Sequence, residues 1–256
     1  MGSGPPLVLV NGYAATKDDW DPTFLDSLGS FASVLCPDNA GVGDSPATAT
    51  LSVASMAEDV LALMDARGIA SAPVAGWSMG GFVAQVMAAR APERVEALVL
   101  LSTDGGGPGA VRSTDEVAAA LVDHGGTPRD RATRLLGLLF PPSLATGIDA
   151  QFGDVVAAAR AALDPDVLTA QERAMDAWHA ERSDGRLASI ACPVLVAAGS
   201  EDVVIPPENA ALLAAALPGA SEPTVFEGGG HAFMAQEPAR LAQLIEEFRY
   251  GVAPQT

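Results

Sequence analysis

Short apolar runs alternate with amphipathic segments along most of this chain. The apolar runs have the length and composition of strands buried on both faces of a sheet, and the segments between them repeat their apolar residues at helical spacing. The predicted strands are residues 7–10, 32–36, 72–75, 97–102, 193–199 and 224–226. The predicted helices between and after them are residues 20–28, 55–68, 208–217 and 238–248, with one more that begins near residue 82. This alternation predicts an α/β fold with a doubly wound, mostly parallel sheet.

The alternation stops between residues 105 and 191, where the pattern is helical and no convincing strand occurs. Helices are predicted over residues 131–139 and 155–163. Capping boxes, in which a Ser or Thr and a Glu three residues later pair with backbone N–H groups, predict helix starts at Ser55–Glu58, Ser113–Glu116 and Thr169–Glu172. We therefore predict a helical cap insertion at residues 105–191 over a core made of residues 1–104 and 192–256.

The segment Gly76-Trp77-Ser78-Met79-Gly80 joins a predicted buried strand to a predicted helix. A sharp turn between the two forces the central serine into strained backbone geometry and exposes its hydroxyl at the carboxyl edge of the sheet. Small residues on both sides let the strand and the helix approach each other. The alternative is a glycine-rich turn with a solvated serine. Because the strand and the helix are both present, we interpret Ser78 as a nucleophile.

A serine nucleophile needs a base, and the chain has three histidines. His231 follows three glycines directly after the last predicted strand, so its loop can approach Ser78 closely. His124 and His179 are interpreted as surface or packing residues. The base in turn needs a carboxylate to orient its ring. Asp202, after the strand that ends at Gly199, is the first candidate.

Two other carboxylates compete for this orienting role. Glu201 is the neighbour of Asp202, and Asp104 emerges at the same sheet edge after an earlier strand. Substitution of Asp202 and Asp104 by Asn, one at a time, would decide between them. Attack on a carbonyl also needs N–H donors for the oxyanion. The backbone N–H groups of Met79 and Tyr13 are predicted to supply them, although Asn11-Gly12 by itself fits a plain turn equally well.

Composition and charge narrow the partners of the protein. The net charge is −18 and Lys17 is the only lysine, so no basic surface for nucleic acid is expected. No metal cluster, dinucleotide fingerprint or phosphate loop occurs, so no cofactor is implied. No signal peptide and no apolar run long enough to span a bilayer is found. Cys36 and Cys192 are expected to be reduced and far apart, which is typical of a cytoplasmic protein.

With these motifs in place, the chain resembles the α/β-hydrolase fold family over nearly its whole length. Within that family it is similar to esterases, enol-lactone hydrolases and cofactor-free haloperoxidases (perhydrolases), which carry a helical cap. Two loops depart from the pattern of the family, which has His-Gly where this chain has Asn11-Gly12 and an arginine where it has Ala40. Members also begin with two additional strands. Their lack leaves strand 32–36 as a sheet edge, which we expect a second subunit (a homodimer) or an irregular amino terminus to cover.

The resemblance implies hydrolysis of a small to medium carboxylic ester or lactone through an acyl-enzyme. Trp77, Phe140, Phe152 and Trp178 are predicted to line an apolar substrate pocket, and the alternative for each is packing within the protein. The same residues would also serve perhydrolysis, C–C bond hydrolysis or acyl transfer. A further hypothesis comes from a different class: the chain is a ligand-binding protein that has kept its serine but does not catalyse a reaction. A probe that modifies active serines discriminates that hypothesis from an enzyme.

Overall fold

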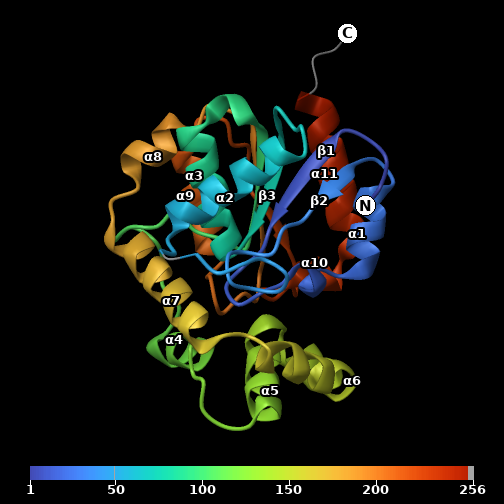
Figure 1. The fold of residues 1–256 in the computed structure, drawn as a ribbon, viewed down its shortest axis with the longest axis vertical. Coiled ribbons are helices and arrows are strands. Elements are labelled where there is room, and N and C mark those ends of the chain that lie inside the picture. Colours follow the sequence, from blue (N-terminus) through green and yellow to red (C-terminus); the bar gives the residue numbers. More distant parts are fainter. Residues whose placement is uncertain (49, 253–256) are drawn as a thin grey trace.

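One parallel sheet forms the centre of the computed structural model, which describes residues 1–48 and 50–252. Its strands are β1 (Pro6–Val10), β2 (Ser33–Leu35), β3 (Ala72–Trp77), β4 (Val95–Leu101), β5 (Val194–Gly199) and β6 (Thr224–Phe226). They lie in the order β2-β1-β3-β4-β5-β6, and every neighbouring pair is parallel (Figure 1). The predicted doubly wound α/β fold is confirmed. All carboxyl ends of the strands therefore meet at one edge of the sheet.

Helices cover both faces of this sheet. One face carries α2 (Val53–Ala66), α3 (Met79–Arg90) and α9 (Glu208–Ala216), and the other carries α1 (Pro22–Gly29), α10 (Phe233–Gln236) and α11 (Pro238–Val252). Successive strand residues serve opposite faces: Val8 packs with the first group of helices and Leu9 with the second. Because both faces of a strand are buried, its sequence is continuously apolar rather than alternating.

The chain between β4 and β5 forms five further helices, all within the described residues. They are α4 (Asp115–Leu121), α5 (Pro128–Leu139), α6 (Pro142–Ala161), α7 (Pro165–Ala180) and α8 (Asp184–Ser189). Figure 1 shows α4, α5 and α6 as a lobe beside the carboxyl edge of the sheet, while α7 runs back toward the core. The last of these helices, α8, packs against α3 and α9. We call residues 105–191 the cap segment.

The three helix starts predicted from capping boxes are wrong. One differs by a single residue, since Thr114 and not Ser113 is the N-cap of α4. Helix α2 begins after Ser52, whose hydroxyl accepts the N–H of Ser55 at 3.0 Å, so Ser55 lies inside the helix rather than capping it. Thr169 also lies inside a helix, because α7 begins at Pro165 with Asp164 as its N-cap. The Thr169 hydroxyl donates to the carbonyl of Pro165 at 3.0 Å instead. A capping pattern in sequence does not exclude an earlier start, and proline at the first helical position favours one.

Strand β2 forms one edge of the sheet, as the sequence predicts, and the amino-terminal segment lies along it. The N–H of Val34 donates to the carbonyl of Met1 at 2.7 Å, and the amino group of Met1 donates to the carbonyl of Val34 at 3.0 Å. A Cβ at Gly2 would overlap the carbonyl of Ala32, so this close approach requires glycine. An irregular amino terminus thus pairs with the middle of the edge strand. The homodimer stays a prediction.

The two cysteines are not joined in a disulfide. Cys36 and Cys192 are free, partly buried thiols that lie after β2 and before β5. Over the described ranges, none of the helices combines the length and the apolar character needed to cross a bilayer.

Candidate active site

Ser78 occupies the sharp turn between β3 and α3. Its backbone has φ 56° and ψ −124°, a left-handed conformation that a residue with a Cβ rarely adopts. A Cβ at Gly76 would overlap the carbonyl of Gly80, and one at Gly80 would overlap the carbonyl of Val10, so strand and helix touch through their glycines. The carbonyl of Ser78 accepts a hydrogen bond from the Thr103 hydroxyl at 2.8 Å. The strained turn is therefore held by packing and by a neighbouring strand end.

His231 and Asp202 form a buried pair at the same edge of the sheet. The Nδ1 atom of His231 lies 2.9 Å from Oδ2 and 3.0 Å from Oδ1 of Asp202, and their side chains are 3% and 0% exposed. Oδ1 also accepts the N–H groups of Val204 and Ile205, both at 2.9 Å. A carboxylate only accepts hydrogen bonds, so it holds the proton on Nδ1 and leaves Nε2 free to act as a base.

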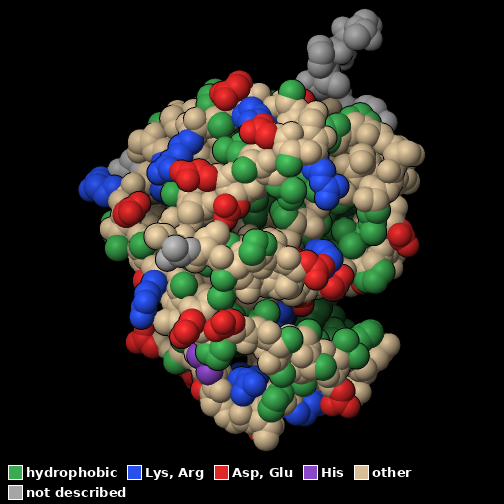
Figure 2. Space-filling model, in the orientation of Figure 1, with side chains coloured by type: hydrophobic (Ala, Val, Ile, Leu, Met, Phe, Trp, Pro, Cys, Tyr) green, Lys and Arg blue, Asp and Glu red, His purple; other side chains and the backbone are tan. Residues whose placement is uncertain are grey.

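A cavity of about 460 Å³ joins these residues. Ser78 and His231 both line it, together with Gly12 and Trp77, and its opposite wall comes from the cap segment. Figure 2 shows the surface hollowed between the core and the cap lobe. The indole N–H of Trp77 donates to the carbonyl of His231 at 2.9 Å, which ties the histidine loop to β3. The structure thus brings serine and histidine to one cavity, with the aspartate behind the histidine.

The two predicted oxyanion donors belong to segments beside Ser78. Tyr13 lies in the loop after β1 and lines the cavity, and Met79 is the first residue of α3. Neither N–H donates to another residue in the described part of the chain. A Cβ at Gly12 would lie 3.2 Å from the Cβ of Ser78, so the loop passes directly over the serine. The amino terminus of α3 and the loop after β1 therefore both lie against Ser78.

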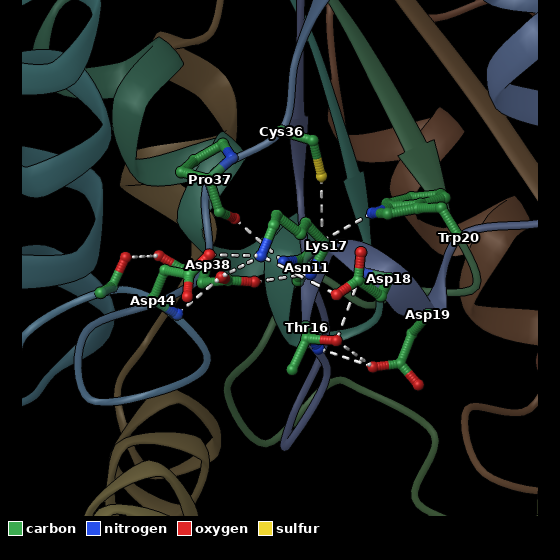
Figure 3. A network of polar contacts seen from close by, with 11 residues as sticks. Asn11, Thr16, Lys17, Asp18, Asp19, Trp20, Cys36, Pro37, Asp38 and Asp44 are labelled. Carbon is green, nitrogen blue, oxygen red and sulfur yellow. Dashed lines mark hydrogen bonds and ion pairs between the residues drawn. The ribbon is translucent and has the colours of Figure 1, made fainter. Parts of the chain in front are cut away.

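Asn11, which stands where the resemblance expects histidine, fixes the start of this loop. Its side chain is fully buried, accepts the indole N–H of Trp20 at 2.6 Å, and donates to the carbonyl of Pro37 at 2.9 Å. Its own backbone carbonyl accepts a hydrogen bond from the Asn39 side chain at 3.1 Å. Figure 3 shows Asn11 between the loops that follow β1 and β2. Asn11 thus joins two loops and orders the residues before Tyr13.

The loop after β2 lacks the arginine of the family pattern but still contacts a cation. Lys17 Nζ lies 3.2 Å from Asp38 and 2.8 Å from Asp44, and the N–H of Lys17 donates to Asp38 at 2.6 Å (Figure 3). Hydrogen bonds to Asp44 and Asp38 raise the pKa of Lys17, and Lys17 lowers the pKa of Asp44. The only lysine of the chain thereby ties the loops after β1 and β2 together.

Asp104, the alternative to Asp202 in the sequence analysis, pairs with a different histidine. His179 Nε2 lies 3.0 Å from Oδ2 of Asp104, and His179 Nδ1 lies 2.8 Å from the carbonyl of Met175. The other carboxylate oxygen accepts the N–H of Gly106 at 2.7 Å and the indole N–H of Trp178 at 3.1 Å. Asp104 thus joins the end of β4 to α7 instead of orienting His231. Both Asp104 and His179 line the cavity, a role that sequence analysis missed for His179.

Only one of the four predicted pocket aromatics, Trp77, lines the cavity. Trp178 is buried against the core, where its ring stacks on Phe82 with 4.7 Å between centroids. Phe152 is 46% exposed on α6, and Phe140 packs at the end of α5 against the core cluster of the α1 and α11 face. The sequence shows that these residues are apolar, but it does not show which side of a cap helix faces the cavity.

The cap wall of the cavity is mixed, with apolar residues such as Leu135 and Met175 beside charged and polar ones. The charged and polar residues of the cap segment that line the cavity are Arg112, Ser113, Asp123, His124, Arg131, Arg134, Arg160, Glu172, Asp176 and His179. The hydroxyl of Tyr13 donates to Oε1 of Glu172 at 2.6 Å, and Nε2 of His124 lies 2.8 Å from the same oxygen. Burial and this bond to Glu172 raise the pKa of Tyr13. Among the described residues, no three His, Cys, Asp or Glu side chains gather into a metal site.

Comparison with known proteins places this geometry in a family. A family model described as the alpha/beta hydrolase fold matches residues 5–238, and the chain belongs to this family. RutD of Azorhizobium caulinodans, named as a proposed carbamate hydrolase, is 30% identical, with 96% of this chain and 92% of RutD covered. BpoC of Mycobacterium tuberculosis, named as a proposed non-heme bromoperoxidase, is 28% identical, with 96% and 95% covered.

Solved structures agree with this assignment. A hydrolase from Pseudomonas aeruginosa PA01 superposes with a TM-score of 0.81 at 28% identity, covering 97% of this chain and 92% of that one. The enol-lactonase from Burkholderia xenovorans LB400 superposes with a TM-score of 0.82, again covering 97% and 92%, but at 23% identity. The second likeness shows the fold alone.

Proposed function

We propose that this protein is a serine hydrolase that cleaves a small to medium carboxylic ester or lactone through an acyl-enzyme. The observation that carries the proposal is the arrangement at the sheet edge. Ser78 sits at φ 56° on one wall of a cavity whose lining includes His231, and His231 Nδ1 is 2.9 Å from a buried Asp202. Strained backbone at a serine beside a paired histidine is typical of an activated nucleophile.

The proposed reaction uses each group at one atom. His231 Nε2 takes the Ser78 proton as Oγ attacks the carbonyl carbon, and the N–H groups of Tyr13 and Met79 stabilise the oxyanion. The C–O bond to the leaving alcohol breaks, and the alcohol takes the proton from Nε2. Water then attacks the acyl-enzyme with His231 again as base, which releases the acid and restores Ser78. Asp202 keeps the imidazole oriented and stabilises its cationic form throughout.

The substrate class follows from the cavity wall. Arg131, Arg134 and Glu172 line a space of about 460 Å³ together with apolar residues such as Phe82 and Leu135. Such a mixed wall favours a small to medium acyl group that has both apolar and polar atoms. Activity should therefore be highest on short to medium acyl chains.

The test is a series of p-nitrophenyl esters from acetate to decanoate, run on the wild type and on the Ser78→Ala variant. In the wild type we expect turnover on the short and medium esters that falls at the longest acyl chains, and in the variant a loss of about 10⁴ or more. A fluorophosphonate probe should label Ser78 in the folded protein. Absence of both hydrolysis and labelling would instead favour the ligand-binding hypothesis.

Two relatives carry names that point to other chemistry for the same residues. RutD is named for carbamate hydrolysis and BpoC for bromoperoxidase activity, so both reactions are second candidates here. A carbamate added to the ester panel tests the first candidate. Hydrogen peroxide with a short organic acid and bromide tests the second, because peroxide then replaces water as the acceptor of the acyl group.

A further inference from the structure

Ala14, the residue after Tyr13, has a backbone conformation that needs outside support. Its φ is 55°, in the left-handed region that favours glycine, although Ala14 carries a Cβ. A non-glycine residue persists there only when neighbouring groups hold it. The Tyr13 N–H lies in the peptide unit directly before the one that joins Tyr13 to Ala14, so whatever holds Ala14 also restricts the direction of the Tyr13 N–H.

The groups that hold Ala14 come from the cap segment rather than from the core. The N–H of Ala14 donates to Oε1 of Gln171 at 2.9 Å, and the carbonyl of Ala14 accepts a short hydrogen bond from the Arg160 guanidinium. One residue earlier, the Tyr13 hydroxyl donates to Glu172 at 2.6 Å. Helices α6 and α7 thereby bind both polar groups of the Ala14 backbone and the neighbouring side chain.

The side chain of Gln171 binds Ala14 from a buried position that is otherwise unfavourable for a polar group. The side chain is fully buried, and its Nε2 has no hydrogen-bond partner among the described residues. Rotating the amide would place its NH₂ group against the N–H of Ala14, so the bond to Ala14 determines the orientation. A buried donor without a partner destabilises the folded state. An apolar residue at 171 would avoid that cost, so the contact with Ala14 distinguishes glutamine from an ordinary core residue.

Arg160 is anchored on its other side. Its guanidinium lies 2.7 Å from Asp19, in the short 3₁₀ turn Lys17–Asp19 that ends the same loop, and its side chain is 11% exposed. The loop from Asn11 to Asp19 is thus fixed by the core at its start and by the cap segment from Tyr13 onward. The bonds that Arg160, Gln171 and Glu172 make with Tyr13 and Ala14 all fall in the loop whose Gly12 lies against Ser78.

We propose that Gln171 is a positioning residue for the oxyanion hole, acting through Ala14. Given the proposed function, on which this inference rests, the cap segment contributes to transition-state stabilisation and also forms a wall of the cavity. Gln171 is not part of the cavity lining, so its effect is carried by the loop and not by contact with substrate. Loss of its acceptor should misalign the Tyr13 N–H, which acts on the transition state more than on bound substrate.

The experiment compares Gln171→Met, which keeps the length of the side chain and removes the acceptor, with Gln171→Glu, which keeps an acceptor. The matched control is Arg129→Met, which breaks the bond to Asp149 at 2.6 Å between α5 and α6 without touching the loop. Substrates are p-nitrophenyl acetate and phenylboronic acid, whose tetrahedral adduct with Ser78 mimics the oxyanion. Thermal unfolding of every variant verifies folding.

We expect Gln171→Met to lower kcat by about 10- to 100-fold with KM within twofold, since losing an oxyanion donor outright costs 10²–10³. Boronate affinity should fall by a similar factor. Gln171→Glu should recover most of kcat, and Arg129→Met should keep it. If Gln171→Met does not fold, Gln171→Leu replaces it, because it also removes the acceptor that binds the Ala14 N–H and puts an apolar side chain at a buried position.

The outcomes separate the two proposals. If the wild type hydrolyses the ester but the acceptor-deleting variant keeps its kcat, or loses no more than Arg129→Met, the positioning role is wrong and the hydrolase stands. A rise in KM at constant kcat would also overturn positioning, because it indicates a lost binding contact. A wild type that neither hydrolyses esters nor reacts with fluorophosphonate overturns the proposed function, and the inference with it.

Discussion

Replacing Asp202 by Asn should stop His231 from acting as a base, although every side chain of the site stays in place. In the wild type, Oδ1 of Asp202 accepts two backbone N–H groups at 2.9 Å, from Val204 and Ile205. In the Asp202→Asn variant the side-chain oxygen must stay on those donors, so the NH₂ group takes the place of Oδ2 opposite His231 Nδ1. Oδ1 also lies 3.0 Å from Nδ1, but its two lone pairs already accept the backbone N–H groups, so Nδ1 faces a donor and the imidazole proton moves to Nε2. That nitrogen then cannot accept the proton of Ser78.

The magnitude follows from this change of tautomer. An Asp-to-Asn substitution that keeps the geometry but reverses the tautomer lowers turnover by about 10⁴ in serine proteases with the same constellation. Each factor of ten corresponds to about 1.4 kcal/mol, so the activation barrier should rise by about 5 kcal/mol. The full effect is expected here because the Asp202 side chain is 0% exposed, so no water can take over its role.

Asp104→Asn is the matched control, since Asp104 also pairs with a histidine at the cavity. Its partner is His179 at 3.0 Å, not His231, so the control should keep kcat on p-nitrophenyl acetate within about tenfold. Steady-state kinetics at pH 8 on both variants, with thermal unfolding to confirm folding, measures the contrast. Retention of more than a tenth of wild-type kcat by Asp202→Asn, or equal losses in both variants, would refute the assignment of Asp202.

Two further predictions concern stability. Asn11→Ala leaves the buried Trp20 indole N–H unpaired, so urea unfolding should show a loss of about 1–3 kcal/mol, and an unchanged midpoint would contradict the role of Asn11. Burial raises the pKa of Cys36 to about 12, whereas an unfolded thiol ionises near 8.5, so the stability of the wild type should fall as the pH rises above about 8.5. Between pH 7 and 10 the free energy of unfolding of the wild type should fall by about 2 kcal/mol more than that of Cys36→Ala. If the two proteins show the same pH dependence, the thiol is not buried.

Much of the fold is predictable because buried parallel strands have a local signature. Apolar composition and flanking turns predict strands at residues 224–226 and 193–199, and the structure has them at Thr224–Phe226 and Val194–Gly199. Helix starts were less accurate: a Thr-x-x-Glu pattern at Thr169 looks like a cap wherever it occurs. Only the backbone decides whether the helix has already begun, as it has at Pro165.

The sequence by itself determined the parallel sheet and the residues at its carboxyl edge. When strands run parallel, every strand end reaches the same rim, so Ser78, Asp202 and His231 could be placed together from topology alone. Their order along the chain and the glycines around Ser78 are local features, and each can be read without knowledge of any distant contact.

Only the tertiary structure decided how the cap segment meets the core. The contacts of Ala14 with Gln171 and Arg160 join residues about 150 positions apart, and they depend on how α6 and α7 pack, which no local pattern records. The same packing turned Phe152 outward and brought His179 to Asp104. Side-chain direction on an inserted helix is set by its partner surface, and that surface exists only after the chain has folded.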